Sequence, residues 1–309
     1  LSLAVSWRIN QATPITGIAL VSFALLATGG RSIPRERLTG FVAMLVDHAR
    51  KRGQPLAESA NLEDPAKLDQ VLATLQDSGI VTRFDGGPTP VYGIAEGQHI
   101  GAAFYRNSML HFVLERAIAE VAALGAMTAP AAHREDKFFE TALALRESLK
   151  FEFFFRERPA FEQGLAAEMD LIDANWRRKL AEARSSRELL DSTFDVGLAH
   201  AALRPFLEAY RIVLDVLLTM PVDTPALESE VLAAADGLGS QYLLEKTIRN
   251  PEAISRQLFG TAWQLARNVR LIEPGPDLAA RRESRSKILR ATLTALDEIE
   301  VQCREALGG

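Results

Sequence analysis

The chain has 309 residues, of which 48% are apolar and 24% charged, and its formal net charge is −5. This composition is typical of a globular protein large enough for two or more subdomains, and the acidic balance argues against a general nucleic-acid binder. The single cysteine, Cys303, excludes an intrachain disulfide; with no Cys/His ligand cluster in the sequence, it favours a reducing, cytosol-facing compartment and no metal site.

The N-terminal part begins with a weak strand pattern and an apolar run. Apolar and polar residues alternate weakly over Leu3–Ile9, as in an edge strand. A polar segment then leads into the apolar run from Ile15 to Ala27. That run is shorter than the roughly 20 residues needed to span a bilayer, so we predict a buried helix. Any membrane contact is expected to be peripheral, at the cytoplasmic face.

The next segments predict two helices and a hairpin. Helices are expected over Arg35–Arg52 and Asp64–Gly79, and strands over Ile80–Phe84 and Pro90–Ile94 flank a turn rich in glycine. Three helices followed by a hairpin is the order of a winged helix, so we predict a winged-helix-like unit within residues 1–98. A DNA-binding regulator is one interpretation, but the basic residues of this unit stand beside acidic ones, and a DNA-binding surface needs several uncompensated cations.

Residues 99–309 are predicted to form a helical bundle, which makes the expected fold class mainly α. The first helix of this part shows no breaker between Gly101 and Leu124. The later helices are expected over Phe138–Phe155, Phe161–Leu180, Ala199–Met220, Asn250–Leu271 and Asp277–Ala306.

Polar side chains that suit an anion or an interdomain contact gather at the start of the long helix. They are His99, Tyr105, Arg106, Asn107 and His111. Arg106 offers a guanidinium fork for a phosphate or CoA group. Alternatively, these residues cap the helix and join it to the neighbouring loop.

Three long segments carry a resemblance to a known family: Ser6–Gly29, Tyr105–Phe112 and Ala142–Phe155. Together they resemble the C-terminal part of the large, membrane-associated bacterial glycerol-3-phosphate acyltransferases, which are homologous to dihydroxyacetone-phosphate acyltransferases. The similarity covers nearly the whole chain and thins after about Asp223.

The resemblance implies acyl transfer from an acyl-CoA or acyl-carrier-protein thioester to glycerol 3-phosphate in phospholipid synthesis, with no other cofactor. It also implies that an N-terminal acyltransferase domain precedes this region and is its partner. Arg8, Asn10 and Thr13 are therefore further candidates for an interdomain or phosphate contact.

The catalytic motif that the resemblance implies, His-x-x-x-x-Asp, is missing. No histidine of this chain is followed by aspartate at the fifth position; the five are His48, His99, His111, His133 and His200. We therefore expect no imidazole paired with a carboxylate so as to activate an alcohol, no catalytic residue, and a noncatalytic C-terminal portion of the enzyme. A stand-alone interaction module and a winged-helix transcriptional regulator remain the alternatives.

Overall fold

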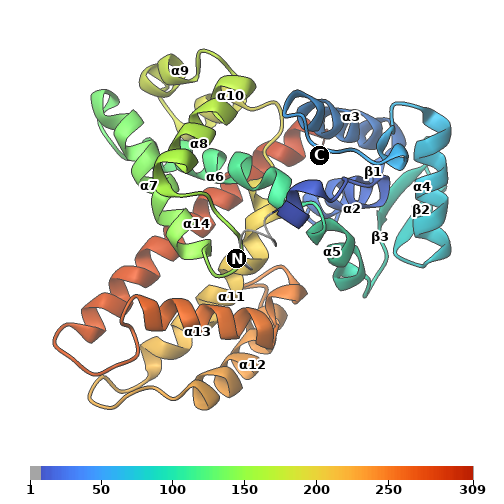
Figure 1. The fold of residues 1–309 in the computed structure, drawn as a ribbon. Helices are drawn as coiled ribbons and strands as arrows, with labels where there is room; N and C mark the ends of the chain where they lie inside the picture. The colour runs from blue at the N-terminus through green and yellow to red at the C-terminus, as the bar shows by residue number, and fades with distance from the viewer. Residues whose placement is uncertain (1–7, 309) are drawn as a thin grey trace.

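The structure, a computed structural model, describes residues 8–308, and this part of the chain is mainly helical with one small sheet (Figure 1). Residues 8–12 are helical, so the predicted edge strand is wrong at Arg8 and Ile9, and its remaining residues up to Trp7 lie outside the described range. Within residues 8–308, no helix is both long enough and apolar enough to cross a bilayer.

The N-terminal lobe is built around one buried helix. Its elements are α2 (Gly17–Ala27), β1 (Ile33–Pro34), α3 (Arg35–Lys51), η1 (Glu58–Ala60), α4 (Pro65–Asp77), β2 (Val81–Phe84) and β3 (Val91–Ile94). Every residue of α2 except Ile18 is buried, because α3, α4 and η1 cover it on several sides. The predictions of a buried helix here, and of α3 and α4, are confirmed within two residues.

A three-stranded antiparallel sheet closes this lobe, in the order β1-β3-β2. The predicted hairpin is confirmed, with Val81 opposite Ile94 and Phe84 opposite Val91. Strand β1 was not predicted, because two residues are too few to show an alternating pattern.

The prediction of one continuous helix up to Leu124 is wrong, because this segment forms two helices, α5 (His99–Asn107) and α6 (Leu110–Ala126). At the break, the Ser108 hydroxyl donates to the carbonyl of Tyr105 at 2.7 Å. The amide of Met109 donates to the carbonyl three residues back, which tightens the turn. Helix α5 packs on α2, whereas α6 packs on the helices that follow.

The rest of the described chain is helical. Its elements are η2 (Ala131–His133), α7 (Arg134–Leu149), α8 (Arg158–Ile172), α9 (Trp176–Glu182), α10 (Ser186–Thr193), α11 (Ala199–Thr219), α12 (Glu228–Leu244), η3 (Pro251–Ala253), α13 (Arg256–Asn268) and α14 (Leu278–Ala306). Helix α11 is central and buried over most of its length, with α6, α12, α13 and α14 against it (Figure 1). The division of the chain at residues 98 and 99 stays a prediction.

Three predicted helices differ at their ends. Helix α7 stops at Leu149, and two of the phenylalanines that follow are partly exposed, Phe151 at 39% and Phe154 at 42%. The stripe from Phe161 is split into α8 and α9, because the Asp173 carboxylate accepts from the amide two residues on and forms a turn. The helix expected from Asn250 is a short 3₁₀ turn followed by α13.

Candidate functional site

The break after α5 divides the predicted polar residues between two places. Arg106 points inward from α5 and reaches η3 and α11, whereas His111 points from α6 toward the N-terminal segment. The sequence pattern placed them on one helical face, and the turn at Ser108 ends that continuity.

Arg106 is the centre of the inner group. Arg106 is only 1% exposed, and its guanidinium donates to both carboxylate oxygens of Glu252, at 2.9 and 2.6 Å. It also donates to the carbonyl of Ala201 at 3.2 Å and to Asn107 Oδ1 at 2.7 Å. The fork that the sequence offered to a phosphate is therefore engaged by a carboxylate of the same chain.

His99 lies on the other side of that carboxylate. Its Nε2 is 3.4 Å from Glu252 Oε1. Burial alone would raise the pKa of Glu252, but the neighbouring His99 imidazole and the charge of Arg106 outweigh it, so the pKa lies below its usual value. Glu252 is thus an anion that ties α5 to η3.

Imidazoles do pair with carboxylates in this fold, whereas the expectation that none is paired so as to activate an alcohol stays a prediction. Besides His99–Glu252, His48 on α3 has its Nε2 2.9 Å from Oε1 of Glu168 on α8. The side chains of the His48 pair are 8% and 0% exposed, and Arg52 binds the second oxygen of Glu168 at 3.0 Å. This pair has no room for a substrate. The sequence test covered only one spacing, whereas both pairs join distant segments.

The His99 pair does reach a cavity. Its volume is about 110 Å³, and it lies between the turn after α2, helix α5, helix α11 and the start of η3. Its polar lining residues are His99, Arg106, His200, Arg204, Arg249, Asn250 and Glu300. A histidine–carboxylate pair beside an arginine-lined cavity of this size could bind and activate a phosphorylated alcohol. Whether it does depends on whether the arginines of the cavity are free to bind a phosphate.

Those charges are already compensated. Arg204 Nη1 lies 2.9 Å from Asp297, and its Nη2 lies 3.1 Å from Glu300. Arg249 pairs with the same two carboxylates. With Arg106 held by Glu252, each of the three guanidinium groups that line the cavity pairs with a carboxylate of the same chain, so none of them is free for a phosphate.

His200 adds no charge to this cavity. It is buried, its Nε2 is 2.8 Å from the carbonyl of Ala27, and burial lowers its pKa to about 4. The imidazole is therefore neutral near pH 7 and joins α11 to the end of α2. The sequence contains no local signal for this contact.

The outer group lies at a second cavity of about 320 Å³. Here His111 Nε2 is 2.7 Å from the carbonyl of Asn10, and burial lowers the pKa of the imidazole. Arg52 on this wall is 2.8 Å from Glu115, which also pairs with Arg156. The arginines of this cavity are compensated as well.

The remaining candidates lie apart from both cavities. Arg8 is exposed, and the Thr13 hydroxyl donates to the carbonyl of Ile9 at 2.9 Å. Tyr105 lines a surface groove of about 620 Å³ between α2, α4 and α5. Whether any of these residues contacts another domain or a phosphate stays a prediction.

Comparison with known proteins gives one consistent family. A family model described as the glycerol-3-phosphate acyltransferase C-terminal region matches residues 1–275. The putative acyltransferases plsB1 of Mycobacterium tuberculosis and Mycobacterium bovis are 39% identical over 293 residues, which cover 92% of this chain and 46% of theirs. A glycerol-3-phosphate acyltransferase of Aeromonas hydrophila is 26% identical over 289 residues, covering 88% of this chain and 33% of its own. The chain therefore spans less than half the length of these relatives.

Proposed function

Because the chain belongs to the family of glycerol-3-phosphate acyltransferase C-terminal regions, we propose that it supports and covers an acyltransferase domain without carrying out the chemistry. The whole enzyme would transfer an acyl group from an acyl-CoA or acyl-carrier-protein thioester to the 1-hydroxyl of glycerol 3-phosphate. The observation that carries this proposal is the family match over residues 1–275, in a chain that spans 46% of its mycobacterial relatives.

The noncatalytic role follows from how the polar groups are used. A general base needs an imidazole oriented by a carboxylate and free to reach the alcohol. The only carboxylate near His99 in the described chain is Glu252, and Arg106 engages both its oxygens. We therefore assign this group the role of holding α5 against η3 and α11.

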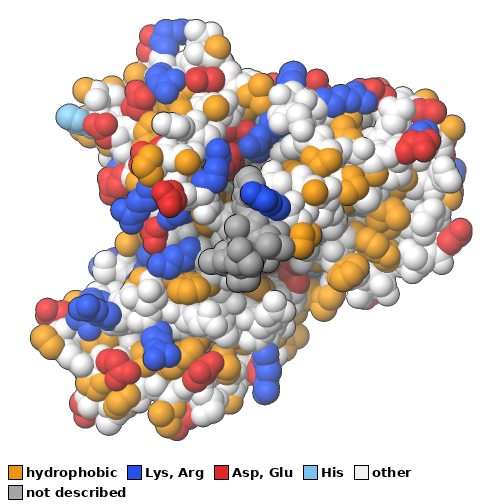
Figure 2. All heavy atoms as spheres, viewed as in Figure 1, with side chains coloured by type: hydrophobic (Ala, Val, Ile, Leu, Met, Phe, Trp, Pro, Cys, Tyr) orange, Lys and Arg blue, Asp and Glu red, His pale blue; other side chains and the backbone are white. Residues whose placement is uncertain are grey.

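The surface around α5 is the proposed contact with the acyltransferase domain. Ile100 and Phe104 lie one turn apart on α5 and are 61% and 74% exposed. Figure 2 shows hydrophobic side chains gathered over α5 and the neighbouring strands. Exposed apolar side chains that cluster beside a groove are typical of an interaction surface.

The N-terminal lobe gives a second reason to expect a protein contact. We infer that it is winged-helix-like, because three helices, α2, α3 and α4, are followed by the β2–β3 hairpin, and β1 joins the same sheet. Most of its basic side chains are paired, however, for example Arg35 with Asp69 and Lys67 with Glu58. These pairs leave little positive charge for DNA, so we assign the lobe to contact with a protein. Any membrane contact would be peripheral, at the cytoplasmic face.

Substitution of Phe104 by aspartate in the full-length enzyme tests this proposal. We expect acyl transfer to fall while the thermal unfolding of the isolated chain stays within a few degrees of wild type, because Phe104 is mostly exposed. Leu244→Asp is the matched control, since Leu244 is 85% exposed on α12, away from this surface. Equal activity of Phe104→Asp, Leu244→Asp and wild type would contradict the proposed contact.

A further inference from the structure

The cavity of about 320 Å³ beside His111 has a size and a lining that suit a small ligand. It lies where the loop between α7 and α8 meets α6, the end of α3 and the N-terminal segment. Three consecutive phenylalanines of this loop line it, Phe153, Phe154 and Phe155, and Phe112 of α6 adds a fourth ring. Phe154 is 42% exposed, so it lies at the surface end of the cavity.

The loop that carries these rings is held by the bundle. Phe153 packs edge-on against Phe206 of α11, with ring centroids 5.0 Å apart. Phe155 packs edge-on against Phe161 of α8, at 5.7 Å. Because such aromatic contacts fix the loop, the aromatic wall is already formed before a ligand binds, which lowers the cost of binding.

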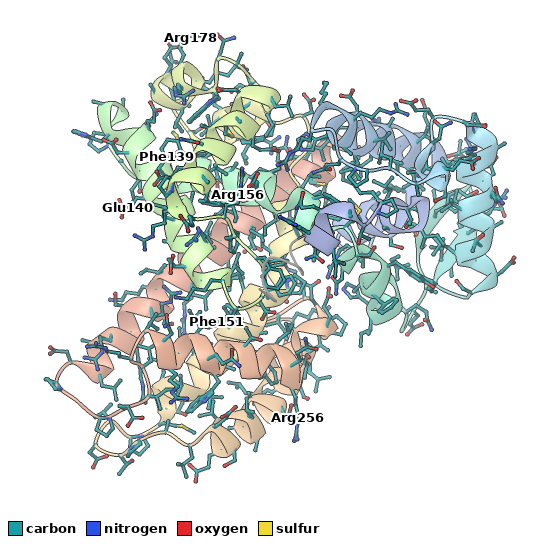
Figure 3. All side chains as sticks on the ribbon, viewed as in Figure 1. Phe139, Glu140, Phe151, Arg156, Arg178 and Arg256 are labelled. Atoms are coloured by element: carbon teal, nitrogen blue, oxygen red, sulfur yellow. The ribbon has the colours of Figure 1, made fainter. Side chains whose placement is uncertain are left out.

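The arginines of this cavity are paired with carboxylates. Arg52 lies 2.8 Å from Glu115 and 3.0 Å from Glu168. Arg156, labelled in Figure 3, also pairs with Glu115. His111 adds no charge near pH 7, because burial lowers the pKa of its imidazole. An anionic ligand would therefore find no guanidinium group here that lacks a carboxylate partner.

Glu152 is the exception among the charged side chains of this wall. Its carboxylate accepts a hydrogen bond from the Tyr210 hydroxyl at 3.3 Å, and no cationic side chain within residues 8–308 forms a salt bridge with it. Burial raises the pKa of Glu152 to about 7, so a proton neutralises it in part of the molecules at neutral pH. A cation in the cavity would replace this proton and lie beside the aromatic rings.

We propose that this cavity binds a small organic cation, whose ammonium group pairs with Glu152 and packs against Phe112 and Phe154. A carboxylate supplies the opposite charge, and aromatic faces attract an ammonium group together with its alkyl substituents. The proposal rests on this cavity alone and does not depend on the proposed contact around α5.

Calorimetric titration of the purified chain with choline and with its neutral carbon isostere, in which a tert-butyl group replaces the trimethylammonium group, tests the need for charge. We expect the isostere to bind at least about tenfold more weakly than choline. Glu152→Gln should weaken choline binding at least about tenfold and leave the isostere unchanged, because only the charge is removed. Phe154→Leu should weaken choline binding about two- to fivefold, because an aliphatic side chain has no ring to attract the cation.

The pH dependence of binding is a second readout, in the wild-type chain. Because the pKa of Glu152 is about 7, its ionised fraction rises about tenfold from pH 6 to pH 8, and choline affinity should rise by the same factor. The groups around it keep their charge in this range. The pKa of His111 is lowered by burial and that of Tyr210 is raised by burial, while the arginines of α3, α14 and the loop stay protonated. Glu152→Gln should bind choline equally at both pH values.

Glu157→Gln is the control, since Glu157 is exposed in the same loop and does not line the cavity. It should bind choline as wild type does. Equal affinities for choline and its isostere, no choline binding at up to about 10 mM, the same choline affinity at pH 6 and pH 8, or unchanged choline binding by a folded Glu152→Gln variant would overturn the proposal. Thermal unfolding of each variant shows that it is folded.

Discussion

Replacement of Arg106 by methionine should destabilise the chain strongly. The Glu252 side chain is 11% exposed, and the substitution removes both hydrogen bonds that Arg106 donates to it. Only His99, at 3.4 Å, would remain beside that charge. Removing one partner of a buried ion pair costs about 3–5 kcal/mol, because the other charge is left uncompensated.

The double variant Arg106→Met/Glu252→Leu separates the lost attraction from the stranded charge. With both charges replaced by apolar groups, we expect a loss of only about 1–2 kcal/mol, clearly smaller than that of Arg106→Met alone. Urea unfolding followed by circular dichroism gives the free energy of unfolding for each variant. Equal slopes against urea would show that the denatured state is comparable.

Arg256→Met is the matched control for this pair. Arg256 also bonds a carboxylate, Asp236, at 3.0 Å, but its side chain is 78% exposed and extends into solvent from the start of α13 (Figure 3). Its loss should cost less than about 1 kcal/mol. If Arg106→Met cost no more than Arg256→Met, or if the double variant were less stable than Arg106→Met, the assigned role of this group would be wrong.

Three further predictions concern stability. Gly17→Ala should lower the free energy of unfolding in urea by about 1–3 kcal/mol, because the new Cβ would lie 2.3 Å from the carbonyl oxygen of Ser59. Its control is Gly40→Ala, which meets nothing within 4 Å and should raise that free energy by about 0.5–1 kcal/mol; the opposite order of the two variants would refute this reasoning. His200 has a folded-state pKa of about 4, below its usual 6.5, so the unfolded state binds more protons between these two pH values. The free energy of unfolding should therefore fall by roughly 3 kcal/mol as the pH drops from 6.5 to 4, and His200→Gln should remove most of this pH dependence. Burial raises the pKa of Glu152 from 4.5 to about 7, so its contribution to the free energy of unfolding is present below pH 4.5 and is lost as the pH rises to 7. Glu152→Gln should remove this loss, which is up to about 3 kcal/mol, and an unchanged pH profile would contradict the raised pKa.

The sequence predicts the regular parts of this fold well. The Thr16 and Asp64 caps, the positive-φ Gly53 and Gly79 after α3 and α4, and the uniform apolar run of α2 are local signals, and the helices begin and end close to them. The break at Ser108 could not be read in this way, because the surrounding residues continue the helical period on both sides.

The candidate site was predicted less well, for a physical reason. Arg106 was identified as a residue of interest, but its carboxylate partner lies 146 residues further along the chain, and no periodicity reports such a contact. The same holds for His48 and Glu168. Patterns along the chain indicate which side chains are unusual, whereas only the folded contacts of Arg106 with η3 and α11 show that its charge is compensated.

The most direct test of the supporting role is a single-turnover assay of the purified chain with glycerol 3-phosphate and an acyl-CoA. We expect no acylated product above the rate of the uncatalysed reaction, because the imidazole at the 110 Å³ cavity shares its carboxylate with Arg106. Product formation by the wild-type chain that disappears in His99→Gln would instead make His99 a catalytic base and refute the supporting role.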